Sequence, residues 1–441
     1  MKTKMKSALK TLHEMRLFLL LWVTQAFSGL GSAVTGYALV VWSYTQEGSA
    51  LVTAGLMIAS YAPYVLCSVF AGALSDRWDK RRTMLVCDAM AALTTLCTLL
   101  LLKTGKLEIW HLYVLNALNG LMNTVQQPAS EVATSALLPK AHYQKVGGLR
   151  YLSSSLNGIL NPIIATAILT LLGMDAVFFF DLLTFAVAFV VLLVFIRIPQ
   201  QDKPQAEKTG LLQSVREGLV FLRERRGILS LIFFLAAINL VASMFNATLP
   251  AMVLNQADET ALGILNSLTG LTTFAGSLIA SVLPKPKSRV RVVCLTLLLS
   301  MSTENFLLAF GKTLPVWCVG AFLGWIAIPL MSTNLDAILR LAIPQEIQGR
   351  VFACRNTLQF FTIPVGYFLG GLLVDAVFEP LMAVQPAESL LVSLFGAGKG
   401  SGAAMCFALQ AVMGVAVCLI FMRNRHIRQM QAEELNIAGV K

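Results

Sequence analysis

Three acidic residues stand inside long apolar stretches, where a charged carboxylate is costly. They are Asp88, Asp181 and Glu304. If these stretches cross a bilayer, a charge at its centre costs about 2.5–3.5 kcal/mol on insertion scales, so each acid is a candidate proton carrier. Asp181 and Glu304 lie deepest in their stretches. Each acid could instead be a structural partner of a neighbouring helix.

A second group of polar residues consists of uncharged amides. Asn116, Asn119 and Asn123 recur at a spacing of three and four residues, which places them on one face of a helix. Three amides in hydrocarbon need water or hydrogen-bonding partners. We therefore expect this face to line a polar cavity.

The sequence predicts no metal ion, no cofactor and no enzymatic activity. None of the eight cysteines forms a CxxC pair, and the four histidines form no HxxxH pair. A nucleophile with an adjacent base is also not evident.

The composition is that of a membrane protein. Of the 441 residues, 56% are hydrophobic and 13% are charged, and the mean hydropathy is +0.72. Soluble domains carry about 25% charged residues, so this chain cannot coat a water-facing globule. The composition excludes an ordinary soluble enzyme, a secreted domain and a disordered chain, and it favours a polytopic helical membrane protein.

Apolar segments long enough to cross the bilayer can be counted along the chain. A hydrocarbon core about 30 Å thick needs about 20 predominantly apolar residues in a helix. Twelve segments reach that length, namely 17–44, 50–74, 83–102, 109–136, 146–171, 176–196, 228–254, 261–283, 290–310, 314–338, 350–376 and 403–422.

The net charge of +11 follows from the topology that these segments predict. All but four of the 34 Lys and Arg residues fall in the two tails and in alternate loops; the exceptions are Lys103, Lys106, Lys312 and Lys399. The positive-inside rule then places both termini in the cytoplasm. The expected location is the inner membrane of the cell. The same positive charge can contact anionic membrane lipids, so it does not indicate nucleic acid as a partner.

The chain divides into two halves of six segments each. Residues 1–196 should form an N-terminal bundle, residues 197–227 a cytoplasmic linker with an amphipathic helix, and residues 228–441 a C-terminal bundle. A weak repeat relates the halves, because Glu131, Pro139 and Arg150 have the same spacing as Asp336, Pro344 and Arg355. Repeats of this kind are typical of secondary transporters.

The loop between the second and third segments carries a recognisable motif. It reads Gly72-Ala-Leu-Ser-Asp76-Arg77-Trp-Asp-Lys80-Arg81-Arg82. This loop resembles the signature G-x-L-x-D-R-x-x-[RK]-[RK] of the major facilitator superfamily, and the topology of six plus six helices extends the resemblance over the whole chain. Asp79 departs from the usual second glycine, and aspartate there is familiar in the drug-efflux branch that includes macrolide efflux proteins.

The resemblance implies an all-α fold of twelve transmembrane helices in two pseudo-symmetric six-helix bundles, with a gate at this loop. Asp76 would accept hydrogen bonds from the N-terminus of the segment 350–376, and Arg77 would pair with Glu131. Asp336 in the second half could pair with Lys285, Lys287 or Arg289. The expected gating residues are Gly72, Asp76, Arg77, Arg81, Glu131 and Asp336.

The resemblance also implies which segments face a central cavity. The residues expected to bind substrate are Gln25, Tyr61, Asn116, Asn119, Asn123, Asn239, Asn246, Trp325 and Gln359. A cavity of amides and aromatic rings suits a bulky, amphiphilic, largely neutral compound. Asp181 lies in a stretch that is similar to the efflux branch, whereas the segments that carry Asp88, Asp181 and Glu304 are peripheral in the superfamily.

These features together predict a monomeric secondary transporter that exports amphiphilic drugs or metabolites, macrolide-like compounds among them, in exchange for protons. One departure concerns coupling, because proton-coupled exporters of the superfamily usually carry an arginine in the fourth helix and the segment 109–136 has none. A lipid or lysolipid translocase of the same fold remains an alternative, as does a membrane receptor or scaffold that does not transport.

Overall fold

The computed structural model describes residues 15–137, 143–198, 211–284, 286–344 and 347–437. Within these ranges, side chains are described except at 68–77, 135, 143–154, 211–215, 349 and 433–437.

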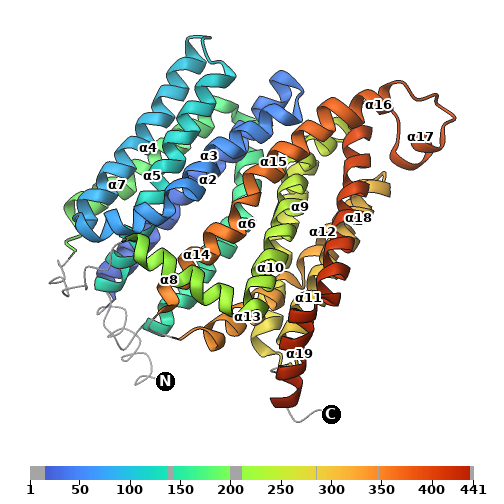
Figure 1. Cartoon of the computed structure of the whole chain (residues 1–441). Coiled ribbons are helices and arrows are strands. Elements are labelled where there is room, and N and C mark those ends of the chain that lie inside the picture. The colour runs from blue at the N-terminus through green and yellow to red at the C-terminus, as the bar shows by residue number, and fades with distance from the viewer. Residues whose placement is uncertain (1–14, 138–142, 199–210, 285, 345–346, 438–441) are drawn as a thin grey trace, which may run out of the picture. The chain divides into compact units, whose positions relative to one another are not determined.

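Six long helices make up the described part of the first half of the chain (Figure 1). They are α2 (Arg16–Glu47), α3 (Ala50–Arg77), α4 (Lys80–Lys103), α5 (Ile109–Ala136), α6 (Tyr143–Leu172) and α7 (Met174–Val194). The shortest has 21 residues, which at a rise of about 1.5 Å per residue is enough to cross about 30 Å of hydrocarbon.

The second half contains six further membrane-spanning lengths of helix and two amphipathic helices. Its elements are α8 (Leu211–Glu224), α9 (Arg226–Gln256), α10 (Glu259–Val282), α11 (Arg289–Phe310), α12 (Leu314–Trp325), α13 (Ile328–Ala342), α14 (Gln348–Phe360), α15 (Thr362–Leu372), the π-helix η3 (Leu373–Phe378), α16 (Glu379–Ala383), α17 (Leu390–Phe395), α18 (Ser401–Arg423) and α19 (Arg425–Ile437).

Two of the predicted continuous segments are interrupted. The segment expected at 314–338 divides into α12 and α13, and Pro329 follows the break. Pro329 lies in the first turn of α13, where its missing backbone N–H removes no hydrogen bond within the helix. The segment expected at 350–376 divides into α14, α15 and the π-helix η3.

Eleven helices in the described part of the chain are long and apolar enough to span a membrane. The fourth predicted segment, now α5, is not among them although it has 28 residues. Its asparagines and glutamines lower its mean hydropathy. A helix of this length with one polar face is typical of a span that borders a water-accessible cavity.

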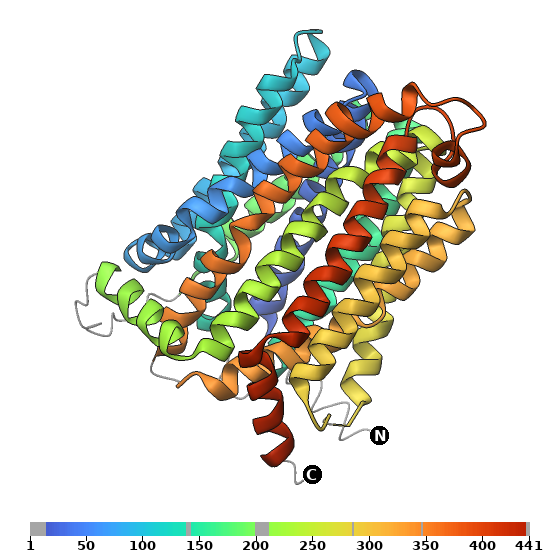
Figure 2. The same ribbon diagram turned by 45° about the vertical axis from the view of Figure 1, so that its right-hand side comes forward.

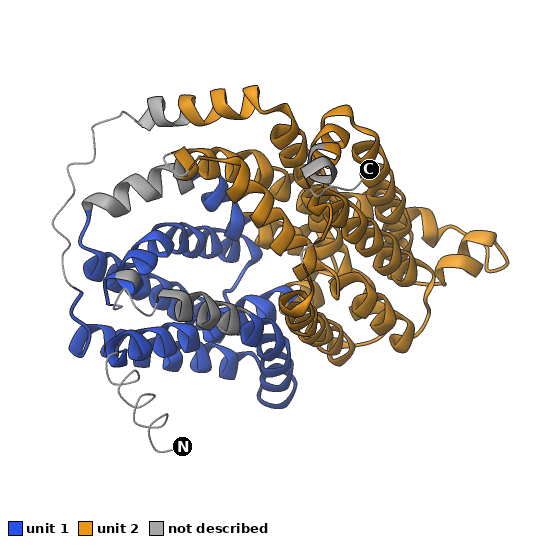
Figure 3. Ribbon diagram, turned by 90° about the horizontal axis from the view of Figure 1, so that it is seen from below, with its two compact units in different colours: residues 1–40, 59–207 blue, residues 41–58, 208–441 orange. Residues whose placement is uncertain are grey.

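The described chain divides into two compact units (Figure 3). Residues 1–40 and 59–207 form the first unit, and residues 41–58 and 208–441 form the second. The tip of the α2–α3 hairpin therefore belongs to the second unit. The predicted division at 1–196, 197–227 and 228–441 stays a prediction.

Each unit has its own apolar core. In the second unit α9 runs between α15 and α18 (Figure 2), and it contributes Leu231, Ile232 and Phe234 to the core. In the first unit one cluster gathers Leu21, Met84 and Leu192 from three different helices. These cores fix the helices that carry the polar residues described next.

Two local contacts fix segments that connect the membrane-spanning helices. Asp79 is the N-cap of α4, and its Oδ1 accepts a hydrogen bond from the backbone N–H of Arg82 at 2.7 Å. An aspartate at this position therefore starts the helix, which glycine would do less well. The amphipathic helix α8 packs on α14, where Glu217 pairs with Arg350.

Candidate functional site

A cavity of about 720 Å³ lies within the first unit. It is lined by residues of α2, α4, α5 and α7 and by Ser60 of α3. The polar residues that line it are Gln25, Ser28, Ser32, Thr35, Ser60, Asp88, Thr94, Thr95, Thr98, Asn116, Asn119, Asn123, Gln126, Gln127, Ser130 and Asp181. Leu39, Leu115, Leu182 and Phe185 add apolar surface to the same walls.

Asp181 of α7 is one of two carboxylates in this cavity, and it is only 4% exposed. Ser32 of α2 donates to its Oδ1 at 3.1 Å, and Thr95 of α4 donates to its Oδ2 at 2.9 Å. Gly31 packs directly against Asp181, and an added Cβ at that glycine would lie 3.1 Å from the carboxylate. The carboxylate is therefore fixed where α2, α4 and α7 meet.

Asp88 of α4 is the second carboxylate, and it is 5% exposed. Gln126 of α5 donates to its Oδ1 at 2.5 Å, and Gln25 of α2 donates to its Oδ2 at 3.2 Å. Asp88 thus joins α4 to α2 and α5, as Asp181 joins α7 to α2 and α4. The sequence suggested that these acids lie on peripheral helices, yet both side chains line the same cavity as the asparagine face of α5.

Neither carboxylate makes an ion pair with a described residue; their partners are neutral hydroxyl and amide groups. A buried charge held only by neutral donors can be neutralised by a proton or by a cationic ligand. No group of three or more His, Cys, Asp or Glu side chains that could hold a metal ion occurs in the described part of the chain.

The three asparagines of α5 line the cavity in the arrangement that their spacing predicted. The amide of Asn123 donates to Oδ1 of Asn119 at 3.4 Å. Asn116 instead donates to the backbone carbonyl of Leu112, one turn earlier in its own helix, at 2.9 Å. The wall therefore offers a substrate uncharged donors and acceptors next to apolar side chains.

Glu304, the third acid, lies in the second unit and is 5% exposed. The indole N–H of Trp325 donates to its Oε1 at 2.9 Å. Gly324 packs against the same side chain, since a Cβ there would lie 2.6 Å from its Oε2. Glu304 therefore contacts the last turn of α12, immediately before the break between α12 and α13.

The other residues expected to bind substrate have varied surroundings. In the second unit, Asn239 donates to the backbone carbonyl of Gln359 at 3.1 Å, and the side chain of Gln359 accepts from Arg355. Asn246 is exposed.

In the first unit, the rings of Tyr61 and Tyr64 pack together with centroids 5.6 Å apart. The structure thus brings Gln25, Asn116, Asn119 and Asn123 to one cavity and places Tyr61 outside its lining.

Of the six expected gating residues, the structure describes the side chains of Arg81, Glu131 and Asp336. The side chains of Gly72, Asp76 and Arg77 lie outside the described residues, so their gate stays a prediction. Arg81 donates to the backbone carbonyls of Leu192 and Leu193 near the end of α7. Glu131 of α5 is exposed.

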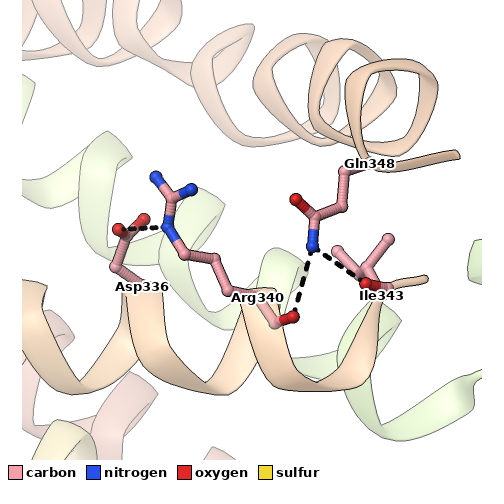
Figure 4. A network of polar contacts seen from close by, with 4 residues as sticks. All are labelled: Asp336, Arg340, Ile343 and Gln348. Atoms are coloured by element: carbon pink, nitrogen blue, oxygen red, sulfur yellow. Dashed lines mark hydrogen bonds and ion pairs between the residues drawn. The ribbon is translucent and has the colours of Figure 1, made fainter. Parts of the chain in front are cut away.

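Asp336 forms an ion pair within its own helix. Nε of Arg340, one turn later in α13, lies 2.9 Å from Oδ2 of Asp336 (Figure 4). Gln348, the first residue of α14, donates to the backbone carbonyls of Arg340 and Ile343. This network closes the C-terminal end of α13 against α14.

Sequence reasoning did not single out several residues that the structure brings into polar sites. Thr95 and Gln126 hold the two cavity carboxylates, and Asp375 and Glu379 each bind backbone N–H groups of another segment. Hydropathy could not reveal them, because their partners are distant in sequence. The pair of glycines just before η3, Gly370 and Gly371, was the one local signal of close packing near Asp375.

The comparison with family models decides the classification. Residues 21–257, more than half of the chain, match the model of the Major Facilitator Superfamily. The chain belongs to this superfamily. Its relatives include macrolide efflux protein A of Streptococcus pyogenes, which is 23% identical over 368 residues covering 82% of this chain and 90% of the relative.

Other relatives are named multidrug efflux pumps. Multidrug efflux pump Tap of Mycolicibacterium fortuitum is 25% identical over 379 residues, which cover 84% of this chain and 91% of the pump. The predicted resemblance to the drug-efflux branch of the superfamily is confirmed by these relatives.

Solved structures share the fold. A mutant form of the nucleoside transporter NupG gives a TM-score of 0.69 at 12% identity, covering 92% of this chain and 99% of that transporter. A bacterial homologue of the iron transporter ferroportin gives 0.67 at 13% identity, covering 93% and 98%. The predicted fold class, an all-helical membrane protein of the major facilitator type, is confirmed. This superfamily member is a multi-pass membrane transporter and not an enzyme.

Proposed function

We propose that this transporter exports amphiphilic, largely neutral compounds of the macrolide-like kind, in exchange for protons, by alternating access. The observation that carries the proposal is the cavity of the first unit. It combines neutral amides, apolar side chains and two buried carboxylates that lack a basic partner among the described residues.

The lining supports a substrate of mixed polarity. The amides of α5 can hydrogen-bond to hydroxyl or carbonyl groups, while Leu182 and Phe185 offer apolar contact. An anionic substrate would need a cation in the cavity, and the described lining contains neither Lys nor Arg. The names of the relatives, macrolide efflux protein A and multidrug efflux pump Tap, agree with this substrate class.

The carboxylates support the exchange of protons. Asp181 is our principal candidate for the proton-carrying group, with Asp88 as a second candidate in the same cavity and Glu304 as a third in the other unit. A proton bound to Asp181 would neutralise it without breaking the contacts that Ser32 and Thr95 make, because hydroxyl groups can donate or accept. The protein would act as a monomer in the inner membrane, among anionic lipids, with both termini in the cytoplasm.

Accumulation of a labelled macrolide and of a fluorescent amphiphilic cation in cells tests this proposal. Wild-type protein should lower the accumulation of at least one of these compounds, and a protonophore should abolish the difference. Asp181→Asn should raise accumulation to the level of cells without the transporter, since the amide keeps the shape of the carboxylate but binds no proton.

Asp175→Asn provides the matched control on the same helix. Asp175 makes an exposed ion pair with Lys103 at 2.8 Å and does not line the cavity, so this variant should export normally. If wild-type protein, verified in the membrane, left the accumulation of both compounds unchanged, the proposal of drug export would fail. Movement of a labelled lysolipid in the same cells would then favour a lipid translocase.

A further inference from the structure

The carboxylate of Asp375 binds the start of a helix that is more than 300 positions earlier in the sequence. Asp375 lies in the π-helix η3, and it contacts residues 49–51, where the α2–α3 hairpin turns. Its Oδ2 accepts from Ser49 Oγ at 2.6 Å and from the backbone N–H of Leu51 at 2.8 Å, and its Oδ1 accepts from the backbone N–H of Ala50 at 3.0 Å.

These three bonds satisfy groups that α3 cannot satisfy itself. The first N–H groups of a helix have no partner within the helix, and a carboxylate near them is also stabilised by the helix dipole. Ser49 is the residue that caps α3 locally, because its Oγ accepts from the backbone N–H of Val52 at 3.1 Å. Asp375 therefore completes the cap from a different helix.

The backbone around this contact is shaped for close approach. A Cβ at Gly371 would lie 2.6 Å from Cα of Leu51 and 3.0 Å from Cβ of Ala54, so only glycine fits where α15 meets α3. Ala50 and Ala54 are fully buried. A π-helical turn is rare and is often found at functional positions, and here it presents Asp375 to the hairpin.

A second set of contacts holds the other arm of the hairpin. Tyr44 of α2 is 6% exposed, and its hydroxyl accepts from Nδ2 of Asn255 in α9 at 2.5 Å. Nζ of Lys399 lies 6.0 Å from the centre of the Tyr44 ring, within the range of a cation–π interaction. The hairpin tip, residues 41–58, is thus held by α9, by η3 and by the segment before α18, all within the second unit.

We infer that Asp375 is a gating residue, which latches the hairpin tip to the second unit and must release it in each transport cycle. The inference rests on alternating access as proposed above, because α2 and α3 continue from this tip into the first unit. Loss of a helix N-cap changes stability enough to shift an equilibrium between latched and released states about tenfold. When the contact breaks, water can enter and solvate the carboxylate, so that no charge is left in hydrocarbon.

Labelling of a cysteine placed beneath the hairpin tests the latch without any substrate. Ala54→Cys puts a thiol at a fully buried position beside Gly371. Purified protein in lipid nanodiscs, where both faces are open to solvent, would be treated with a charged maleimide, and labelling of the chain without this change gives the background from the eight native cysteines. Adding Asp375→Asn should raise the labelling rate of Cys at position 54 roughly tenfold.

Asp258→Asn is the matched control. Asp258 is the N-cap of α10 and accepts from the backbone N–H of Ala261 at 2.7 Å, so it caps another helix of the second unit and not the hairpin. This variant should leave the labelling rate within about twofold of the parent, because it weakens a similar cap elsewhere. Equal rates in Asp375→Asn and its parent, or an equal rise with Asp258→Asn, would overturn the inference.

A disulfide offers an independent measurement if Asp375→Asn does not fold. Ser49→Cys combined with Asp375→Cys would place two thiols where the hydroxyl and the carboxylate now touch. Oxidation should stop transport of a macrolide in liposomes and reductant should restore it. Undiminished transport by the fully cross-linked protein would overturn the latch, whereas absence of transport in the wild type would count against the proposed substrate and leave the labelling result intact.

Discussion

At the scale of single residues, the three buried acids are held in different ways. Asp181 and Asp88 each receive hydrogen bonds from two helices and line a cavity. Glu304 belongs to the other unit, receives one hydrogen bond from an indole and is not among the residues that line that cavity. A group that exchanges protons with a substrate cavity must reach it, so this difference ranks Asp181 and Asp88 above Glu304. Apolar context alone placed Asp181 and Glu304 deepest in their stretches, and it did not show which acids line a cavity.

The pair of Trp325 and Glu304 leads to a prediction about stability. Trp325→Phe removes the one side-chain donor described for a carboxylate that is 5% exposed. Leaving a buried acceptor without its partner costs about 1–3 kcal/mol, so the melting temperature of the purified protein should fall. Adding Glu304→Gln should recover part of the loss, because a neutral amide is cheaper to bury than a carboxylate. A double variant less stable than Trp325→Phe would refute this account.

At the scale of elements, sequence patterns predicted most helices closely and missed their interruptions. The segments expected at 83–102 and 176–196 are α4 (Lys80–Lys103) and α7 (Met174–Val194). The breaks after Trp325 and Phe360 and the π-helix η3 were not predicted. Hydropathy reports whether a segment suits hydrocarbon, and it does not report how the backbone is hydrogen-bonded within that segment.

Glycine packing between helices of the first unit can be tested by a matched pair. A Cβ at Gly120 of α5 would lie 2.1 Å from the backbone carbonyl oxygen of Ser60, whereas one at Gly36 of α2 would meet nothing within 4 Å. Gly120→Ala should therefore separate α5 from α3 and lower the melting temperature, at a cost of about 1–3 kcal/mol.

Gly36→Ala should instead leave the melting temperature unchanged or raise it, because alanine favours the helix by about 0.5–1 kcal/mol. Thermal unfolding of the two purified variants in the same detergent compares them directly. Equal effects of the two changes on the melting temperature would show that the contact between α5 and α3 does not restrict the residue at position 120.

At the scale of the whole molecule, composition and charge were enough to predict a polytopic helical membrane protein. The signature loop at Gly72–Arg82 and the topology predicted the superfamily from the sequence alone. The cavity was predictable only in part. The spacing of Asn116, Asn119 and Asn123 predicted one wall, but the convergence of Asp88 and Asp181 on that wall depends on how α4 and α7 pack against α2 and α5, which no local pattern encodes.

The assignment of the hairpin tip was likewise beyond sequence reasoning. The predicted bundles follow the spans along the chain, and the contacts of the folded chain group residues 41–58 with the second unit. Long-range contacts made by Tyr44, Ser49 and Asp375 determine this. Such contacts link positions that differ by more than 200 in the sequence.

The central claim is that substrate export is exchanged for protons through the cavity that contains Asp181. Purified protein in liposomes, with a pH-sensitive dye inside and a labelled macrolide gradient across the membrane, tests it most directly. Movement of the macrolide down its gradient should drive protons in the opposite direction with the wild type, and Asp181→Asn should abolish that proton flux. Macrolide movement with no proton flux in the wild type, or an unchanged flux in Asp181→Asn, would contradict the claim.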